Sequence, residues 1–514
     1  MSVGAADLAV VIPTRDRWPI LRRTLTALAA QSVRGFEVVV VVDGEDQEVP
    51  ALPEARVVVQ SHAGPGAARN AGARATDRPL LLFLGDDMVP AVDLVAAHLA
   101  AHGREPDPAV AVLGRADWHR EVRRSRLLRW LDWSASQFDY TGIQTADAGF
   151  GRFYSCNVSV KRDLFERAGG FDPDFTYYYE DLDLGWRLGQ AGMVLRYAPD
   201  ARVQHIHRYD VDGLRRRFRG IAAGEWLMTR KHDWFEPFFH PRVIDALTAA
   251  PVDSRWALLA DLVARVPAGR RGDRGRAVLR RGNRWWHQQV GDAFLDGWEG
   301  ARGLDELRDY LGDDYDERRL REHMHEVDAE ERAAPDELTF YRTSTAYLYD
   351  LTVFAISATK TPYLQAMRRH LPPSSRLLDY GCGIGSDGLR LIDAGYHVDF
   401  ADFANPSVDF LRWRLQQRGV DAAVHDVEQH VPGGYDGVYC FDVIEHVDDP
   451  VEFLHRLETL APVVVVNFLE PRTDDVHVHK PLPVGELMAE VRRHQVLHKA
   501  TYHGRSHLVI YRVG

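Results

Sequence analysis

The chain has 514 residues, of which 45% are hydrophobic and 27% are charged, as in ordinary soluble globular proteins. A chain of this length is too long for one ordinary core and predicts roughly two to four domains. The formal net charge of −12 argues against a general nucleic-acid-binding protein.

Cysteine usage and the N-terminal sequence bear on the cellular compartment. Cys156, Cys382 and Cys440 lie far apart and are odd in number, which favours a reducing cytosol without disulfides. Residues 1–12 lack the charged start, long apolar core and cleavage site of a signal peptide. No apolar run approaches the roughly 18 residues that a membrane span requires. We therefore expect a cytoplasmic protein, with peripheral membrane contact left open.

The N-terminal part of the chain alternates short apolar strands with helices, which predicts a parallel α/β sheet. Four strands are predicted, at Leu8–Ile12, Phe36–Val42, Arg56–Val59 and Leu80–Leu84. Asp43 follows the second strand, and Asp86 and Asp87 follow the fourth. These acids should line the carboxyl edge of the sheet, where open α/β sheets bind ligands.

Asp86 and Asp87 are adjacent, so they would repel each other and resist burial unless a cation or hydrogen-bond donors lay between them. A divalent ion with oxygen ligands, itself holding a diphosphate, would satisfy both carboxylates. The alternative interpretation is a solvated Asp-Asp turn at the end of a strand.

Six segments, in this order, resemble family 2 glycosyltransferases with the GT-A fold: PTRDR, VVDG, GPGAARNAG, FLGDDM, YYYEDLDLGWRL and YAPDARVQHIH. The resemblance implies a Rossmann-like GT-A domain, which we assign to residues 1–250. Such enzymes move a sugar from a nucleoside diphosphate to an acceptor hydroxyl. A metal ion stabilises the leaving diphosphate as a Lewis acid.

The resemblance also implies the metal ligands. Asp87 would bind Mn²⁺ or Mg²⁺ directly, and His205 would be a further ligand, with His207 as its substitute. Asp86 would hold the ribose or support the metal site. Gly85 stands where many relatives place the first acid of an Asp-x-Asp motif, which leaves the metal fewer protein oxygens. The histidines could instead be an ordinary surface His-x-His.

The implied nucleotide pocket consists of Asp43, Arg69 and the backbone around Thr14. Asp43 would accept a hydrogen bond from the base ring, which suits uracil or thymine because each has an imide N–H. The resemblance therefore implies a UDP or dTDP sugar as donor. The alternatives are a turn acid at Asp43 and a solvated arginine at the start of a helix.

A second acidic pair, Glu180-Asp181, opens a predicted helix. The simpler interpretation is capping, because carboxylates are stabilised at a helix N-terminus. The functional interpretation makes Asp181 the general base that takes the acceptor's proton while the sugar is displaced with inversion. Glu180 would then hold the acceptor or orient the base. Aromatic residues between positions 116 and 151 could line the acceptor site or simply pack a core.

Residues 251–335 predict a helical linker between two domains. Arginines from Arg270 to Arg281 precede Trp285-Trp286, and acids dominate from Asp305 to Glu331. The basic stretch with its paired tryptophans could lie on a membrane or bind a polyprenyl phosphate. A plain helical linker is the alternative.

A second α/β domain is predicted over residues 336–514. Asp379–Gly385 is a strand that enters a glycine loop, where a ligand can approach the backbone at a helix N-terminus. The next strand ends at Asp402, about twenty residues on, where an acid can bind ribose hydroxyls. These features alone would suit a dinucleotide, but the glycine spacing is Gly-x-Gly-x-Gly.

With His425-Asp426 and the segment YDGVYCFDVIEHVDDP, this loop resembles class I S-adenosylmethionine (SAM)-dependent methyltransferases, which have a Rossmann-like fold. The resemblance implies that Asp379, Gly381 and Gly383 cradle the methionine part of SAM. Asp402 would hold the ribose, and Asp426 the adenine amine. The glycine pair that usually precedes the fifth strand is missing, which leaves the shape of that loop uncertain.

The sulfonium already activates the transferred methyl group, so the protein mainly supplies alignment and a base. His446, after the fourth strand of this domain, is the first candidate base for an acceptor hydroxyl, and a structural histidine is the alternative. His477 and His479 could bind a metal, although a His-x-His spacing alone is weak evidence.

These inferences combine into a bifunctional enzyme. One domain would glycosylate a glycan, a lipid-linked acceptor or a natural product, and the other would O-methylate that sugar or acceptor. A tether raises effective concentration, so both sites are expected to serve one pathway. Two alternatives remain: an active methyltransferase with a degenerate sugar-nucleotide-binding module, or a non-catalytic membrane-associated scaffold.

Overall fold

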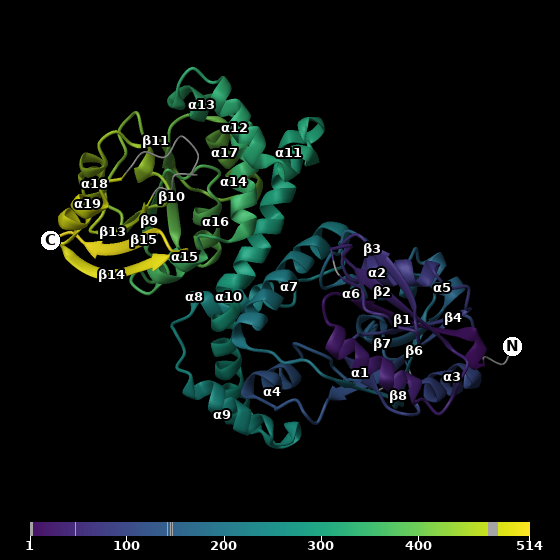
Figure 1. The fold of residues 1–514 in the computed structure, drawn as a ribbon. Helices are drawn as coiled ribbons and strands as arrows, with labels where there is room; N and C mark the ends of the chain where they lie inside the picture. The colour runs from purple at the N-terminus through teal and green to yellow at the C-terminus, as the bar shows by residue number, and fades with distance from the viewer. Residues whose placement is uncertain (1–3, 47, 141, 144, 146, 471–481) are drawn as a thin grey trace. The chain divides into compact units, whose positions relative to one another are not determined.

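The computed structural model describes residues 4–46, 48–140, 142–143, 145, 147–470 and 482–514 (Figure 1). The chain divides into two compact units. Unit 1 comprises Met1–Glu236 and Asp253–Asn283, and unit 2 comprises Pro237–Val252 and Arg284–Gly514. The functional domains 1–250, 251–335 and 336–514 stay a prediction, because the units are defined by packing.

Unit 1 is built on an eight-stranded sheet with the strand order β3-β2-β1-β4-β7-β6-β8-β5. Its strands are β1 (Leu8–Thr14), β2 (Glu37–Asp43), β3 (Arg56–Gln60), β4 (Leu80–Leu84), β5 (Met88–Pro90), β6 (Val110–Trp118), β7 (Asn157–Lys161) and β8 (Val194–His205). The first four strands pair in parallel, which confirms the predicted parallel sheet. β7 and β5 each pair antiparallel with their neighbours.

Helices cover both faces of this sheet. The helices of this unit are α1 (Trp18–Ala29), α2 (Pro65–Arg74), α3 (Leu94–Arg104), α4 (Arg126–Trp133), α5 (Arg162–Arg167), α6 (Glu180–Gln190), α7 (Val211–Lys231) and α9 (Arg255–Ala264), and α9 packs against α4. Because strand side chains alternate, Val10 packs toward α1 and α3, and its neighbour Val11 packs toward α5 and α6 (Figure 1). A buried β1 with both faces covered is typical of parallel α/β sheets.

The small-residue segment of α2 has a packing role. A Cβ atom on Gly72 would lie 2.3 Å from Cγ1 of Val11, so only glycine lets this helix approach β1 so closely. The helix carries Arg69 on its buried side. The small residues of α2 therefore let the helix lie close to the sheet, and this places Arg69 against the strands.

Unit 2 contains a seven-stranded sheet with the order β11-β10-β9-β12-β13-β15-β14. Its strands are β9 (Arg376–Tyr380), β10 (His397–Asp402), β11 (Val424–Asp426), β12 (Gly437–Cys440), β13 (Val463–Leu469), β14 (Gln495–Tyr502) and β15 (Ser506–Arg512). Strands β9 to β13 are parallel, and β15 runs antiparallel to both of its neighbours. This arrangement confirms the predicted Rossmann-like second domain.

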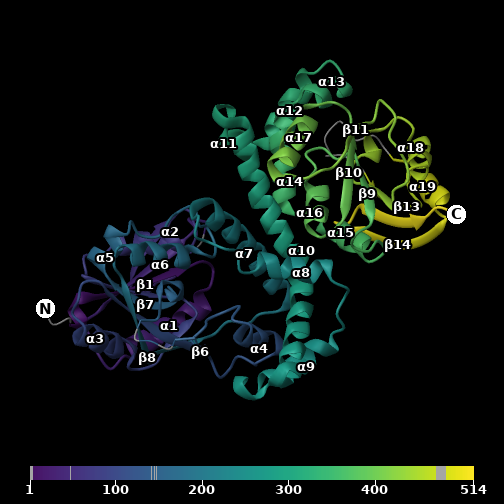
Figure 2. The same ribbon diagram turned by 180° about the vertical axis from the view of Figure 1, so that it is seen from behind.

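Helices again lie on both sides of the sheet. The helices after residue 345 are α14 (Ala346–Ser357), α15 (Thr361–Arg368), α16 (Ser386–Asp393), α17 (Pro406–Arg418), α18 (Pro450–Glu458) and α19 (Val484–Val491). In Figure 2, α14, α16 and α17 lie on one side of the strands, and α18 and α19 on the other. The remaining helices are α8 (His240–Thr248), α11 (Glu317–Arg321), α12 (His323–Ala333) and α13 (Glu337–Thr343).

The 40-residue helix α10 (Gly272–Leu311) contributes to both units. Its later half carries acids that pair with arginines of unit 2: Asp292 with Arg368, Asp296 with Arg390, and Glu299 and Glu306 with Arg414 and Arg418. The Arg414 side chain is fully buried. This half of α10 is therefore part of the core of unit 2. Within the described residues, every helix is either too short or too polar to cross a lipid bilayer.

Candidate active sites

The first site begins where β4 ends. Thr14 donates a hydrogen bond from Oγ1 to Oδ2 of Asp86 over 2.8 Å, and Thr24 donates to the Asp86 carbonyl over 2.7 Å. Arg17 forms an ion pair with Asp86 over 2.8 Å and also contacts Asp87. Both carboxylates are buried. Donors and a cation therefore lie around the acidic pair, and it is not a solvated turn.

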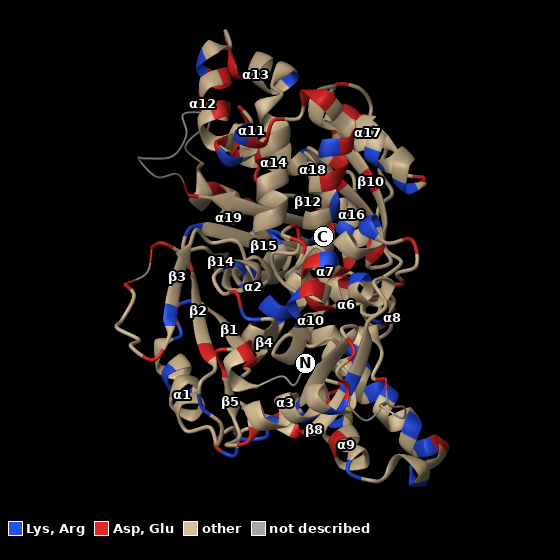
Figure 3. Cartoon of the chain, turned by 90° about the vertical axis from the view of Figure 1, so that its right-hand side faces the viewer, with Lys and Arg blue, Asp and Glu red and all other residues tan. Residues whose placement is uncertain are grey.

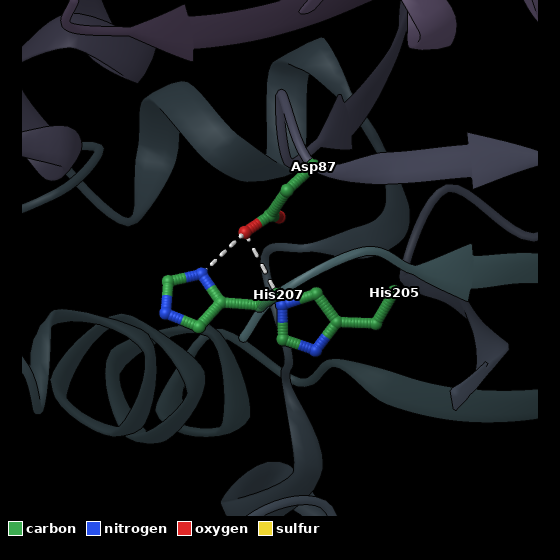
Figure 4. Close-up of side chains that lie close together, drawn as sticks. All are labelled: Asp87, His205 and His207. Carbon is green, nitrogen blue, oxygen red and sulfur yellow. Dashed lines mark hydrogen bonds and ion pairs between the residues drawn. The ribbon is translucent and has the colours of Figure 1, made fainter. Parts of the chain in front are cut away.

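Strand pairing brings two histidines to Asp87. β5 follows Asp87 directly and pairs with the end of β8, where Met88 lies opposite His205. Oδ2 of Asp87 is 3.2 Å from Nε2 of His205 and 3.4 Å from Nδ1 of His207 (Figure 4). The three ligand atoms lie within 4.8 Å of one another. One carboxylate and two imidazoles form a donor set that suits a divalent transition-metal ion.

The two acids of this pair differ electrostatically. Burial and the charge of Asp87 raise the pKa of Asp86 to about 7. Burial alone would also raise the pKa of Asp87, but His205, His207 and Arg17 together hold it well below its usual range. Asp87 is therefore the stable anion of the pair, and the carboxyl group better suited to a cation.

Two residues of this site were not predicted. Arg17, which precedes α1, lies against both acids, and its only sequence signal was the PTRDR segment. Trp118, at the end of β6, stacks on His205 with a centroid distance of 5.0 Å. Trp118 falls in the stretch 116–151, whose aromatic residues the sequence assigns only to an acceptor site or a core.

Asp43 ends β2 and holds the loop that leads into α2. Its carboxylate accepts hydrogen bonds from Gln60, His62, Ala63 and Gly64 over 2.8–3.0 Å. Burial opposes the charge, yet these four donors lower the pKa of Asp43. The two oxygens of a carboxylate can accept about four hydrogen bonds in total, so donors of the protein already occupy the acceptor positions of Asp43.

The second acidic pair opens α6. The backbone enters it through Tyr178 and Tyr179 at positive φ, 63° and 68°, a conformation that is costly for aromatic residues. Oδ2 of Asp181 accepts from the Ser155 backbone N–H over 2.9 Å. Its Oδ1 is buried and has no hydrogen-bond partner among the described residues. Such an atom is unusual and points to a ligand.

Glu180 lies beside Arg69, with 3.4 Å between Oε1 and Nη1. Burial and the neighbouring Asp181 raise the pKa of Glu180 to about 7, and burial also raises the pKa of Asp181. Each acid of the pair is therefore easier to protonate than an exposed carboxyl group.

Hydrogen bonds between segments that are far apart in the chain bring these residues to one edge of the sheet. Thr14 contacts Asp86, and the next residue, Arg15, donates to the Asp43 carbonyl over 2.9 Å. Ser155 donates to Asp181, and the Cys156 carbonyl accepts from the Gly85 N–H over 3.2 Å. The structure thus brings together Thr14, Asp43, Arg69, Asp86, Asp87, Glu180, Asp181 and His205 from segments far apart in the chain.

The second site lies at the carboxyl edge of the unit 2 sheet. Gly381, Gly383 and Gly385 all have positive φ, between 50° and 75°. The Gly383 N–H donates to Asp402 over 2.9 Å. Burial raises the pKa of Asp402 to about 6, and burial together with Asp387 raises the pKa of Asp379 to about 8. Glycine adopts positive φ without steric cost, so this loop can turn tightly beside Asp402, and the cofactor-binding role of these residues stays a prediction.

Asp426 lies opposite Asp402 in the parallel register of β11 and β10. Its carboxylate accepts hydrogen bonds from the Glu428 N–H over 3.0 Å and from the Gln429 side chain over 3.1 Å. The acid thus stabilises its own turn, and each oxygen retains room for another donor.

His446 ends a short 3₁₀ helix, Ile444–His446. Its Nδ1 is 3.2 Å from the Tyr341 hydroxyl and 3.4 Å from Oε1 of Glu337, both on α13. The neighbouring Glu445 is only 1% exposed, and both of its carboxylate oxygens lack hydrogen-bond partners among the described residues. Glu445, Tyr341 and Glu337 were not predicted. Glu445 is adjacent to His446 in the YDGVYCFDVIEHVDDP segment, whereas nothing in the local sequence relates Tyr341 and Glu337 on α13 to this loop.

A half-buried lysine also belongs to this region. Nζ of Lys360 lies 3.5 Å from Asp442 and 3.9 Å from Asp387. Burial alone would lower the pKa of Lys360, but these acids raise it. His477 and His479, the other suggested metal ligands, lie outside the described residues.

Three family models match the chain. The model for Glycosyl transferase family 2 matches residues 9–169, and that for Glycosyl transferase family group 2 matches residues 107–264. The model for a methyltransferase domain matches residues 356–506. Each match falls on the sheet that carries one of the two sites.

Curated relatives match the first part of the chain. A pre-mycofactocin glycosyltransferase of Mycobacterium tuberculosis is 32% identical over 281 residues, covering 52% of this chain and 57% of the relative. A validoxylamine A glucosyltransferase of Streptomyces hygroscopicus subsp. jinggangensis is 33% identical over 228 residues, covering 36% of this chain and 52% of the relative. The chain thus spans just over half the length of these relatives.

Among solved structures, the chain resembles the mannosyltransferase PcManGT from Pyrobaculum calidifontis in complex with GDP-Man and Mn²⁺. The sequence identity is 18% and the TM-score 0.36, with 58% of this chain and 87% of that chain covered.

Proposed function

Because the chain joins a family 2 glycosyltransferase domain to a methyltransferase domain, we propose that it is a bifunctional enzyme. Unit 1 transfers a sugar from a UDP or dTDP donor to an acceptor hydroxyl with inversion. Unit 2 methylates an oxygen of that sugar or acceptor with SAM. One relative is named as a glucosyltransferase, so a glucose donor is among the first to test.

The donor diphosphate binds at the carboxyl end of β4. Asp87, His205 and His207 would hold Mn²⁺ or Mg²⁺, which supplies Lewis-acid stabilisation of the leaving diphosphate. Gly85 stands where the usual motif has an acid, so the metal would lose one carboxylate ligand. The imidazole of His207 would supply a ligand in its place. The Arg17 guanidinium lies within reach of both acids and pairs with the phosphate oxygens when the donor enters.

The nucleoside half of the donor lies toward Asp43, Arg69 and the backbone around Thr14. The carboxylate of Asp43 already has four donors, so the base N–H must replace one of them. His62 is the donor best placed to leave, because 54% of its side chain is exposed. This exchange makes the 60–64 loop a determinant of base recognition.

The observation that carries the sugar-transfer proposal is the buried Oδ1 of Asp181, which has no hydrogen-bond partner in the part of the chain that the structure describes. Ser155 holds the other carboxylate oxygen, so Oδ1 keeps a fixed direction. An acceptor hydroxyl would supply the missing donor and then lose its proton to the carboxylate as the sugar is displaced. Arg69 holds Glu180 beside it, where this second acid binds the acceptor.

In unit 2, SAM supplies an activated methyl group when bound. The glycine loop and Asp379 would cradle its methionine part, Asp402 would hold the ribose and Asp426 the adenine amine. His446 is oriented by Glu337 and Tyr341, and it accepts the proton of the acceptor hydroxyl.

Purified full-length protein tests the proposal through two readouts, nucleoside diphosphate release and S-adenosylhomocysteine formation. Nucleotide sugars are screened with and without Mn²⁺. Asp181→Asn should lower sugar transfer by roughly 10³-fold or more, because it removes the base at nearly constant shape, and leave methyl transfer unchanged. Asp87→Ala should abolish both metal-dependent donor binding and sugar transfer.

Three outcomes would contradict it. Loss of both activities in Asp181→Asn would exclude separate sites. Unchanged sugar transfer in Asp181→Asn would exclude this residue as the base. Methyl transfer without turnover or binding of any nucleotide sugar would instead favour a degenerate first domain.

A further inference from the structure

Helix α9 and the turn that follows it expose an apolar row. The exposed fractions are 44% for Leu258, 40% for Leu259, 49% for Leu262 and 39% for Val266. Large apolar side chains are usually exposed singly, and four within nine positions form a patch that calls for a partner. We refer to these four residues as the α9 row.

The opposite face of α9 is well packed. Ala257 and Ala260 are buried, and a Cβ atom on Gly282 of α10 would lie 2.2 Å from Cβ of Ala260. Asp261 is buried and paired with Arg129 of α4 over 2.5 Å and with Arg265 over 3.1 Å. Small residues and a buried ion pair therefore fix the rotation of α9, and the α9 row is held outward.

Helical geometry places the exposed residues on one side. At about 100° per residue, Leu258 and Leu262 lie on one side of α9 at a spacing of four, with Leu259 beside them, and Val266 lies in the turn just after the helix ends at Ala264. Arg255 and Arg265 are 73% and 60% exposed and fall on the same side. The face thus combines an apolar centre with cationic residues at its border.

The surrounding segment is strongly basic. Residues 253–283 contain eight arginines and three aspartates, and one of those aspartates is the buried Asp261, although the whole chain carries a net charge of −12. Figure 3 shows Lys and Arg recurring along the ribbon beside the α9 label. The local charge is therefore opposite to that of the protein as a whole.

We propose that α9 docks on the surface of an anionic lipid bilayer. The α9 row enters between the headgroups, and the arginines of residues 253–283 pair with lipid phosphates. A short amphipathic helix with a basic border is the kind of element that lies in the membrane interface. The predicted membrane contact at Arg270–Trp286 is thereby extended to an apolar anchor on the preceding helix.

A second copy of the chain fits this face less well. A symmetric dimer would bring two copies of the same arginine-rich patch together, and their charges would repel. Anionic phosphates instead offer charges of the opposite sign. The proposal does not depend on the proposed reactions, because docking is measured without donor, acceptor or SAM.

Co-sedimentation of the full-length chain with vesicles tests the proposal. We expect binding to phosphatidylcholine vesicles that contain about 30 mol% phosphatidylglycerol, and binding roughly tenfold weaker or less to pure phosphatidylcholine. Binding should weaken at about 0.5 M NaCl. Leu258→Gln/Leu262→Gln should reduce binding at least roughly tenfold, because the apolar anchor is lost.

Matched controls come from unit 2. Met324 and Leu338 are each 49% exposed, so Met324→Gln/Leu338→Gln makes the same change away from α9. Arg255→Glu/Arg274→Glu should also reduce binding, whereas Arg321→Glu/Arg332→Glu should not. Arg321 and Arg332 are each 76% exposed. Circular dichroism confirms that each variant is folded.

Vesicle binding that is absent, or unchanged in Leu258→Gln/Leu262→Gln, would overturn the proposal. So would self-association of the wild-type chain in lipid-free sedimentation velocity that this variant abolishes, because α9 would then be a contact between copies.

Discussion

At the scale of single residues, neighbouring groups give the carboxyl groups of two similar acidic pairs different pKa values. Asp87 faces two imidazoles and a guanidinium, and its pKa falls. Glu180 is buried and Asp181 is half-buried, and the one cation given beside them, Arg69, does not offset the desolvation, so the pKa values of both acids rise. A carboxylate with a lowered pKa suits cation binding, whereas one with a raised pKa suits proton transfer near neutral pH.

The pH dependence of sugar transfer should report the second pair. A general base must be ionised, and burial favours its protonated form. We therefore expect kcat/KM to fall as pH decreases through the raised pKa values of the pair, one of which is about 7 for Glu180. A profile measured between about pH 5 and pH 9 checks this. A rate that stays constant down to pH 5 would contradict the expectation.

Glu445 offers a stability test. Burial and Asp442 raise its pKa from 4.5 to about 8. Between these values the folded protein keeps a proton that the unfolded chain releases, so the free energy of unfolding falls as pH rises. Glutamine cannot ionise, and Glu445→Gln should therefore be increasingly more stable than the wild type from about pH 5 to pH 9.

Thermal unfolding across this pH range provides the measurement. Exposed Glu452 is the control, because Glu452→Gln should leave the pH dependence as it is in the wild type. A stability difference between Glu445→Gln and the wild type that does not change with pH would exclude a buried carboxyl with a raised pKa.

At the level of elements, α10 shows that the charge pattern of a helix does not reveal which residues its acids contact. The sequence predicted a helical linker with basic and acidic parts. In the structure the acids of its later half, from Asp292 to Glu306, meet arginines of α15, α16 and α17. Acidic positions along a helix suggest a solvated face until their partners are known, and these partners lie 76 to 119 residues away.

Breaking this buried network should destabilise unit 2. Glu299 is 1% exposed and binds both Arg414 and Arg418. Glu299→Gln leaves buried arginines short of a counter-charge and should cost about 3 kcal/mol of the free energy of unfolding. Urea unfolding of the full-length chain measures the loss.

Glu317→Gln is the matched control. Glu317 is 45% exposed and pairs with Arg308 at the surface, so its loss should cost under about 1 kcal/mol. Equal effects of the two substitutions would show that burial of the α10 network adds nothing to stability.

For the whole molecule, the two units should respond to different ligands. Each unit has its own sheet and core, so calorimetry of the full-length chain should resolve two transitions. SAM at about 100 times its Kd should stabilise one unit by about 2.7 kcal/mol, and Mn²⁺ with a nucleoside diphosphate should stabilise the other.

Asp87→Ala should remove only the response to Mn²⁺ and nucleotide. If one ligand shifted both transitions equally, or if Asp87→Ala abolished the response to SAM, the two sites would not be independent.

Much of this architecture could be read from local patterns. The apolar runs predicted the parallel strands, and short motifs led to Asp87, Asp181 and Asp402, because hydrophobic periodicity and strand-end acids are properties of neighbouring residues. The fold classes followed for the same reason.

Tertiary structure alone decided how these residues are partnered. His205 meets Asp87 across 118 positions because β5 pairs with β8, and Tyr341 meets His446 across 105. Pairing at such distances depends on which strands and helices become neighbours, and burial then determines which carboxyl groups keep their protons. Among the described residues, Oδ1 of Asp181 has no hydrogen-bond partner and the α9 row is exposed, and both facts depend on side chains that several elements bring together.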